Sequence, residues 1–115
     1  MVNRPLPTRL ALLVCLLVAC GGQAARPCEE MSPGLDRDRC LHDEIGRLPG
    51  TAAPTVLAKG RLIDDTIIRG SAVSAWVAAH VKELNPQMGQ ELCSLLEGQD
   101  KAYCLRRLSS PHLQR

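Results

Sequence analysis

The chain has 115 residues and a formal net charge of +2, from 14 lysines and arginines against 12 aspartates and glutamates. This length allows one domain with a limited core. The near-neutral charge, with no basic run that alternates with aromatic residues, argues against a nucleic-acid partner. Because the chain has one Trp, one Tyr and no Phe, its core must come from Leu, Val, Ile and Ala.

The first twenty residues have the pattern of an export signal. Arg4 and Arg9 precede an unbroken apolar run, which is typical of the positive and apolar regions of a signal peptide. At the end of this run, Leu17-Val18-Ala19-Cys20 resembles the lipobox of bacterial lipoproteins: an apolar residue, two small or medium residues and an invariant cysteine. The resemblance implies a diacylglyceryl group on the Cys20 sulfur and removal of residues 1–19 by a dedicated signal peptidase.

This signal predicts a lipid-anchored protein of the bacterial cell envelope, held to a membrane through the lipid on Cys20. We expect residues 20–26 to be a flexible tether and residues 27–115 to be the folded domain. Gly21, rather than Asp, follows the cysteine, which by analogy with enterobacterial sorting favours the outer membrane. The alternatives are an ordinary secretory signal cut near Gly22-Gln23-Ala24, and a retained membrane helix, for which the apolar run is about half the ~20 residues required.

Removal of 19 of the 115 residues leaves 96, and loss of Arg4 and Arg9 leaves twelve basic against twelve acidic residues. The exported domain is therefore formally neutral. With Cys15 in the signal and Cys20 lipidated, the cysteines that remain are Cys28, Cys40, Cys93 and Cys104. An even number of cysteines in an exported chain below about 100 residues indicates two disulfides.

An internal repeat surrounds these four cysteines. Its pattern is Cys-x-x-(Met/Leu), a glycine, and then Asp-(Arg/Lys)-x-x-Cys-Leu, and the copies cover residues 28–41 and 93–105. A glycine turn between short helices would bring the cysteines of each copy together, so we expect two helical hairpins closed by Cys28–Cys40 and Cys93–Cys104. The nested pairing, Cys28 with Cys104 and Cys40 with Cys93, is the main alternative.

Each copy also has an aspartate two residues after its glycine. We expect Asp36 and Asp100 to be the N-caps of the second helices, where a short carboxylate accepts free backbone N–H groups. A disulfide that closes about a dozen residues contributes roughly 3 kcal/mol in the chain-entropy model.

The stretch between the two copies predicts helices. Residues 47–54 contain two prolines and a glycine and indicate a loop. A helix is then expected from a Thr55 cap to Ile68, followed by a break at Gly70 and a new cap at Ser71. The next apolar face has helical spacing, and its members are Val73, Trp76, Val77, His80, Val81 and Leu84.

Asn85-Pro86 should end this helix, and Pro86 can also occupy the first turn of the helix that follows. This following helix should point Met88, Leu92, Leu95 and Leu96 inward. These elements predict an all-α fold: one small domain of about five or six short helices, with two disulfide-stapled hairpins.

Few residues in this pattern suggest chemistry. His80 interrupts an apolar face, and a partly buried structural histidine is commoner than a ligand or an acid–base group. His42 and His112 stand in polar surroundings and should be solvated. Asp65 and Arg69, four residues apart, predict an exposed helical ion pair.

The cysteine spacing argues against redox and metal chemistry. No Cys-x-x-Cys motif is present, the Cys and His spacings match no zinc module, and an oxidising compartment favours disulfides. No nucleophile elbow, phosphate-binding glycine loop, calcium loop or His-Glu-x-x-His motif occurs either. We therefore expect no catalytic residue, no metal and no cofactor.

The leading hypothesis is a non-enzymatic envelope lipoprotein that presents a small helical domain to a protein partner, with Trp76 and His80 as the interaction surface if Trp76 is exposed. The alternative is a lipid-anchored binding module for a small apolar ligand, with His80 at the pocket mouth. An enzyme that uses Asp64, Asp65 or His80 would need these side chains in one cleft. Arg106 and Arg107 make the C-terminus basic, either as a solvated face or in contact with anionic headgroups.

Overall fold

A computed structural model describes residues 27–110, and every regular element within that range is helical. The α-helices are α2 (Leu35–Gly46), α3 (Ala53–Leu62), α4 (Thr66–His80), α5 (Pro86–Cys93) and α6 (Gly98–Ser109). Three short 3-10 helices accompany them: η1 (Cys28–Glu30), η2 (Gly50–Ala52) and η3 (Val81–Glu83). The predicted all-α class, with five or six short helices, is confirmed.

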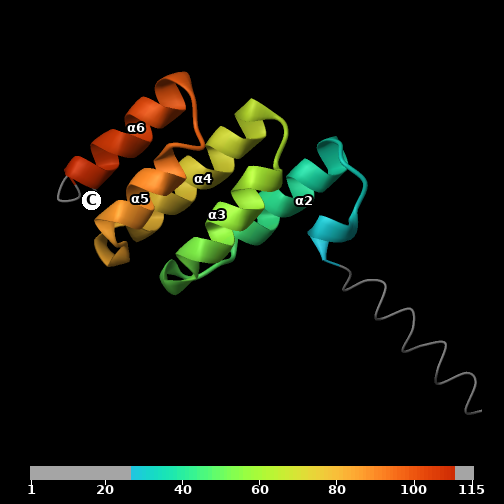
Figure 1. Ribbon diagram of the computed structural model, residues 1–115, viewed down its shortest axis with the longest axis horizontal. Helices are drawn as coiled ribbons and strands as arrows, with labels where there is room; N and C mark the ends of the chain where they lie inside the picture. Colours follow the sequence, from blue (N-terminus) through green and yellow to red (C-terminus); the bar gives the residue numbers. More distant parts are fainter. Residues whose placement is uncertain (1–26, 111–115) are drawn as a thin grey trace, which may run out of the picture. The chain divides into compact units, whose positions relative to one another are not determined.

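The five α-helices form two layers (Figure 1). α4 packs against α2 on one side and α6 on the other, and these three helices run in the same direction. α3 and α5 run the opposite way and pack in front of them in the view of Figure 1. All five belong to one compact unit, residues 31–115, whereas η1 falls in a separate unit, residues 1–30.

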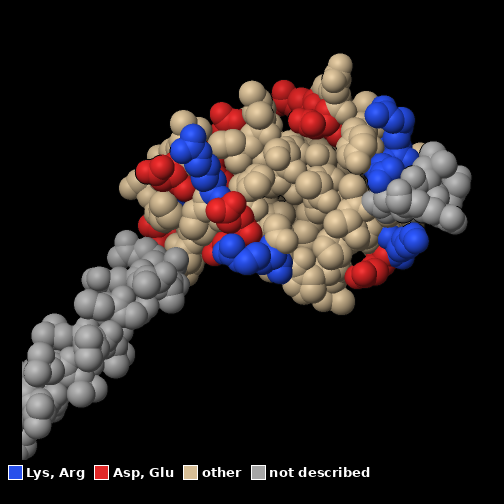
Figure 2. Space-filling model, turned by 180° about the vertical axis from the view of Figure 1, so that it is seen from behind, with Lys and Arg blue, Asp and Glu red and all other residues tan. Residues whose placement is uncertain are grey.

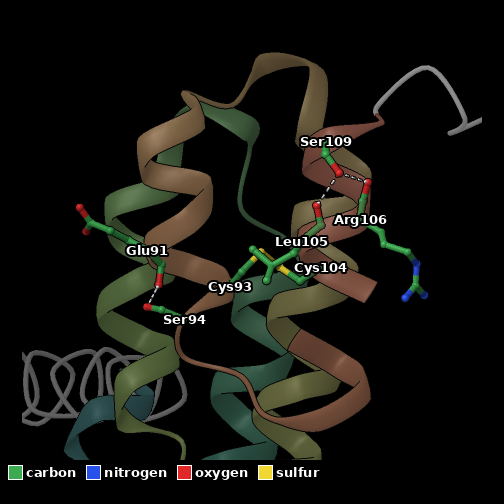
Figure 3. The surroundings of a disulfide bond; sticks show 7 residues. All are labelled: Glu91, Cys93, Ser94, Cys104, Leu105, Arg106 and Ser109. Carbon is green, nitrogen blue, oxygen red and sulfur yellow. Dashed lines mark hydrogen bonds between the residues drawn. A yellow bond between two sulfur atoms is a disulfide. The ribbon is translucent and has the colours of Figure 1, made fainter. Parts of the chain in front are cut away.

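The two disulfides follow the local pairing. Cys93, the last residue of α5, is bonded to Cys104 in α6 (Figure 3). Cys28 and Cys40 are the other disulfide-bonded pair. The local pairing is therefore confirmed and the nested alternative is wrong. The first hairpin is less regular than the second, because the three-residue η1 precedes α2 where a full helix, α5, precedes α6.

The repeated glycines, rather than the repeated aspartates, shape the two turns. Gly34 has a φ of 151° and Gly98 a φ of 56°, both in the region that L side chains rarely adopt. The expected N-caps are wrong: Gly34 and Glu97 occupy the N-cap positions, and neither helix has a side-chain cap. Asp36 and Asp100 lie within the first turns, where their charge favours the positive end of the helix dipole.

The expected break at Gly70 and Ser71 is also wrong, because α4 continues through both residues. Gly70 is buried, and a Cβ atom there would collide with the Asp100 carboxylate on α6. The glycine thus permits a close approach of two helices instead of ending one. The real break lies earlier, where Asp65 caps α4 by accepting N–H groups from Ile67 and Ile68, both at 2.9 Å.

Of the other residues predicted at helix boundaries, some take the predicted position and some do not. Thr55 is not a cap, because α3 already begins at Ala53 and has a proline in its first turn. Pro86 opens α5 as predicted, and the structure adds a cap, since the Asn85 side chain accepts the N–H of Gln87 at 2.8 Å. The predicted helix end at Asn85-Pro86 is wrong, because α4 ends at His80, five residues before Asn85, and η3 lies in the interval.

The core is aliphatic, as the composition requires. Its fully buried large side chains include Leu41, Ile45, Val56, Ile63, Val73, Val77 and Leu92. Most of the face predicted for α4 is buried, whereas Leu84, Met88 and Leu95 are half-buried. Ile67, in the first turn of α4, is 77% exposed. Within residues 27–110, no helix is both long and apolar enough to cross a membrane.

Candidate functional site

One face of the molecule has an uncharged centre with charged side chains at its rim (Figure 2). α4 lies behind α3 and α5 in Figure 1 and therefore faces the reader in Figure 2. Beyond Arg69 this helix carries no Lys, Arg, Asp or Glu, and its exposed residues include Ser71, Ala75 and Ala79. The small side chains leave the surface of α4 accessible to another molecule.

A groove of about 380 Å³ opens on this face between α2 and α4. We call it the α2–α4 groove, and its lining residues are His42, Gly46, Ser71, Ala72, Ala75, Trp76, Ala79 and His80. None of the eight carries a permanent charge. Glycine and alanine supply half of the lining, and the two imidazoles come from the two different helices.

Trp76 lies below this groove and is not an exposed patch. It is 2% exposed, and its indole Nε1 donates a hydrogen bond to the Leu48 carbonyl at 2.9 Å. The half-buried His80 ring lies against the indole, with 4.7 Å between the ring centroids. Trp76 would have formed an interaction surface only if it were exposed, and it is not. The indole is a core group that also fixes the chain after α2.

Ser71, His42 and Asp43 form a chain of hydrogen bonds that the sequence did not predict. The Ser71 Oγ lies 3.3 Å from His42 Nε2, and His42 Nδ1 lies 3.2 Å from Asp43 Oδ1. The order of groups is that of a serine nucleophile, a base and an orienting carboxylate. His42 is half-buried rather than fully solvated, because it shares the groove with Ser71 of the neighbouring helix.

This hydrogen-bond chain lacks the other parts that acyl transfer needs. Ser71 lies inside α4, so its own N–H belongs to the helix and cannot stabilise an oxyanion. The nearby N–H groups of Ile67 and Ile68 are already bonded to Asp65. The Asp43 side chain is 68% exposed, so water competes for the carboxylate that would orient the imidazole. We interpret the chain as a polar link between α2 and α4.

Asp38 is the buried carboxylate of the domain, at 2% exposure. Its two oxygens accept the backbone N–H groups of Asp64 at 3.2 Å and Asp65 at 3.0 Å. It therefore ties α2 to the connection between α3 and α4. The sequence did contain a signal for this burial, since Asp38 stands three and seven residues before the core residues Leu41 and Ile45.

The same connection engages two arginines. Arg37 donates to the Leu62 carbonyl at 3.0 Å and lies 3.6 Å from an Asp64 oxygen. Arg69 donates to the Ile63 carbonyl at 2.8 Å and lies 3.8 Å from Glu97. The predicted ion pair between Asp65 and Arg69 is therefore wrong, because Asp65 caps α4 and Arg69 pairs with Glu97.

The residues of the enzyme hypothesis do not meet in one cleft. Asp64 and Asp65 precede α4 and are engaged in the contacts just described, whereas His80 is the last residue of α4. A helix rises 1.5 Å per residue, so α4 holds the two sites roughly 20 Å apart. An acid–base set that combines these side chains is excluded by that separation.

A second depression lies around η3 and the ends of α5 and α6. A groove of about 690 Å³ is lined mainly by apolar side chains, with Lys82, Gln90 and Ser109 as its polar members. Its apolar lining residues are Val81, Leu84, Pro86, Leu105 and Leu108. We call it the α5–α6 groove. His80 does not line it, so the predicted arrangement with His80 at a pocket mouth does not apply to this groove.

Among residues 27–110, no three His, Cys, Asp or Glu side chains gather as metal ligands would. The four cysteines of this region are in disulfides and hold no free thiol. Cys20, the rest of the export signal and His112 lie outside the described residues.

The fold and grooves define a small all-α domain with two local disulfides and an uncharged helical face. No protein-family model, no curated protein and no solved structure matches the chain. Its function must therefore be argued from its own residues.

Proposed function

We propose that this chain is a non-enzymatic lipoprotein of the bacterial cell envelope that presents its helical domain to a protein partner. The observation that carries the proposal is the uncharged face of α4 with the α2–α4 groove. The residues predicted for the interaction surface, Trp76 and His80, both line this groove, one as a buried wall and the other at its end.

The chemistry of the groove indicates what kind of partner it fits. Its alanines and glycine form a shallow apolar depression, and the imidazole of His80 offers a hydrogen bond, whereas both ring nitrogens of His42 are bonded to Ser71 and Asp43. Interfaces commonly combine an apolar centre with a charged rim, as this face does. A partner that inserts an uncharged side chain between α2 and α4 would satisfy both features.

The anchor and the surface can be tested separately. Mass spectrometry of the membrane fraction should find the N-terminal peptide beginning at a diacylglyceryl-modified Cys20. A peptide that begins near Ala24, without lipid, would support the ordinary secretory signal instead and leave the surface proposal standing.

The surface test replaces Ala75, an exposed residue of the α2–α4 groove, by Glu. Ala75→Glu should lower recovery of the partner from solubilised membranes by at least about tenfold, because a charge in an apolar contact has no compensating group. Ala58→Glu is the matched control, since Ala58 is exposed on α3, in the other layer. Trp76→Ala is unsuitable, because loss of a buried indole destabilises the fold by roughly 3–5 kcal/mol. Equal recovery with both glutamate variants would refute the surface.

The α5–α6 groove supports a second candidate, a lipid-anchored module for a small apolar or amphipathic ligand. Its volume of about 690 Å³ lies in the range of small-molecule sites, and Lys82 stands at its edge where a ligand carboxylate would be neutralised. A fluorescent fatty acid should bind the full-length chain in neutral detergent, and Leu105→Glu should abolish that binding. No saturable signal above that of protein-free micelles would remove this candidate.

A further inference from the structure

Tyr103 and two consecutive arginines form a cluster on the exposed side of α6. The guanidinium carbons of Arg107 and Arg106 lie 5.5 and 6.0 Å from the centroid of the Tyr103 ring. These distances are within the range of a cation–π contact. The three side chains and Ser110 line a hollow of about 170 Å³. We call these four residues the Tyr103 cluster.

The two arginines of this cluster have no acidic partner in the described part of the chain. Arg37 and Arg69 show the usual arrangement, in which the terminal nitrogens donate to carbonyls and face carboxylates. Arg107 makes no such contact through its terminal nitrogens, and its Nε, like those of Arg37 and Arg69, is buried without a hydrogen bond. Arg106 extends away from the disulfide (Figure 3). Both guanidiniums therefore keep N–H donors for an external acceptor.

The position at the end of α6 accounts for only part of this positive charge. The last carbonyls of a helix carry roughly half a negative charge, which favours arginines in the last turn. The two positive guanidiniums exceed this half negative charge by about one and a half charges. Among residues 27–110 no carboxylate lines the hollow itself, and Asp100 lines an adjoining depression that shares Tyr103 and Arg106 with it. An excess of positive charge thus remains at the hollow.

We propose that the Tyr103 cluster binds a phosphate group. Two adjacent guanidiniums suit phosphate better than a single carboxylate, because phosphate offers several charged oxygens to donors from different directions. The Tyr103 and Ser110 hydroxyls add two further donors. The ligand is a phosphate monoester or diester, either in a lipid headgroup or in solution.

The test uses the full-length chain in neutral detergent, with the arginine Nε–H groups followed by proton–nitrogen NMR. One arm adds phosphatidylglycerol to the micelles, and the other adds inorganic phosphate to the solution. Saturable shifts at Arg106 and Arg107 in the first arm alone identify a lipid headgroup, and shifts in the second arm identify a soluble phosphate. Both results support the proposal, and neither depends on the anchor or on the α2–α4 groove.

The matched variants remove equal charge from two places. Arg106→Gln/Arg107→Gln should weaken binding by roughly tenfold or more, since charge-assisted hydrogen bonds to phosphate are lost. Arg47→Gln/Arg61→Gln should change the affinity for phosphate by less than about twofold. These two arginines are exposed and lie outside the Tyr103 cluster, so their removal changes only the long-range, salt-screened charge. The proposal is overturned by equal weakening in both variants, by equal binding of acetate, or by no saturable shift in either arm.

Discussion

α2 and α6 contain the same motif but use it differently. In both helices an aspartate in the first turn precedes a disulfide cysteine and a leucine. The leucine of α2, Leu41, is 0% exposed, whereas its counterpart in α6, Leu105, is 40% exposed. Both helices lie at an edge of the layer and pack against two neighbours, α2 against α3 and α4, and α6 against α4 and α5. The difference is one of rotation: in α2 the cysteine is half-buried and the leucine is buried, whereas in α6 the cysteine is buried and the leucine is exposed.

The position two residues before the cysteine separates the helices further. In α2 it is Asp38, buried and bonded to two backbone N–H groups. In α6 it is Ala102, which is exposed. The repeat therefore fixes the turn and the disulfide, and the neighbouring helices decide whether the outer face supports the fold or remains free for a ligand. In α2, Arg37 and Asp38 are bonded to the connection between α3 and α4. In α6, Arg106 and Arg107 have no carboxylate partner among residues 27–110.

The largest effect should distinguish the two leucines. Leu41→Ala should lower the free energy of unfolding by about 3–4 kcal/mol, since it opens a cavity in the core. Leu105→Ala should cost less than about 1 kcal/mol, because its side chain is already partly in water. Urea unfolding of the two variants measures both values. Equal losses would show that α6 is covered in solution.

Loss of the second disulfide should rank next. Cys93→Ala/Cys104→Ala should lower the free energy of unfolding by about 3 kcal/mol, because the bond closes a loop of about a dozen residues in the unfolded chain. The Cys28–Cys40 bond closes a loop of nearly the same length. Cys28→Ala/Cys40→Ala should therefore lower the free energy of unfolding by the same amount within about 0.5 kcal/mol. A clear inequality, measured by urea unfolding, would mean that one hairpin stays partly structured after the other elements unfold.

The buried carboxylate should have a smaller effect. Asp38→Ala should cost about 2 kcal/mol, because the N–H groups of Asp64 and Asp65 lose a charged acceptor but are only partly shielded from water. Asp36→Ala, on the exposed side of the same helix, should cost less than about 1 kcal/mol. Faster hydrogen exchange at residues 64 and 65 in the first variant alone would locate the effect.

The smallest effect concerns the contact between α4 and α6. Gly70→Ala should lower stability by about 1 kcal/mol, because the added Cβ displaces Asp100 and this outweighs the better helix propensity of alanine. In an Asp100→Ala background the same substitution should become neutral or stabilising. A double-mutant cycle of thermal unfolding measures this coupling. Additive effects would contradict the close approach.

The sequence predicted the parts of the fold that depend on local rules. The apolar period of α4, the proline in the first turn of α5 and the short disulfide loops all depend on residues within a few turns. The all-α class follows from the same helical spacing of apolar residues.

The failures came where a local signal has two meanings. Gly70 has the appearance of a helix breaker, but it provides room for a neighbouring helix. Asp65 could have been a surface ion-pair partner, and it is an N-cap whose own N–H is held by Asp38. The contacts of Gly70 with Asp100 and of Asp65 with Asp38 join segments more than twenty residues apart, which no local window contains. The cap itself is local, and its signal lay in Asp65 standing two and three residues before Ile67 and Ile68.

The candidate site shows the same division. His80 was identified because it interrupts an apolar face, and it does line the α2–α4 groove. The sequence did not predict that α2 contributes His42 to the groove, because His42 and Ser71 are 29 residues apart and meet only through the packing of α2 against α4. Trp76 was a surface candidate only if exposed, and it is buried, as its spacing on the same face as Val73 and Val77 equally allows.

The central claim, that the face of α4 receives a protein partner, is most directly tested by photo-crosslinking in living cells. A photoreactive residue at Ala75 or Ala79, in the α2–α4 groove, should yield one discrete crosslinked species. The same residue at Ala58, exposed on α3, should yield none. Crosslinks of equal strength and identity from all three positions, or none from Ala75 and Ala79, would contradict the claim.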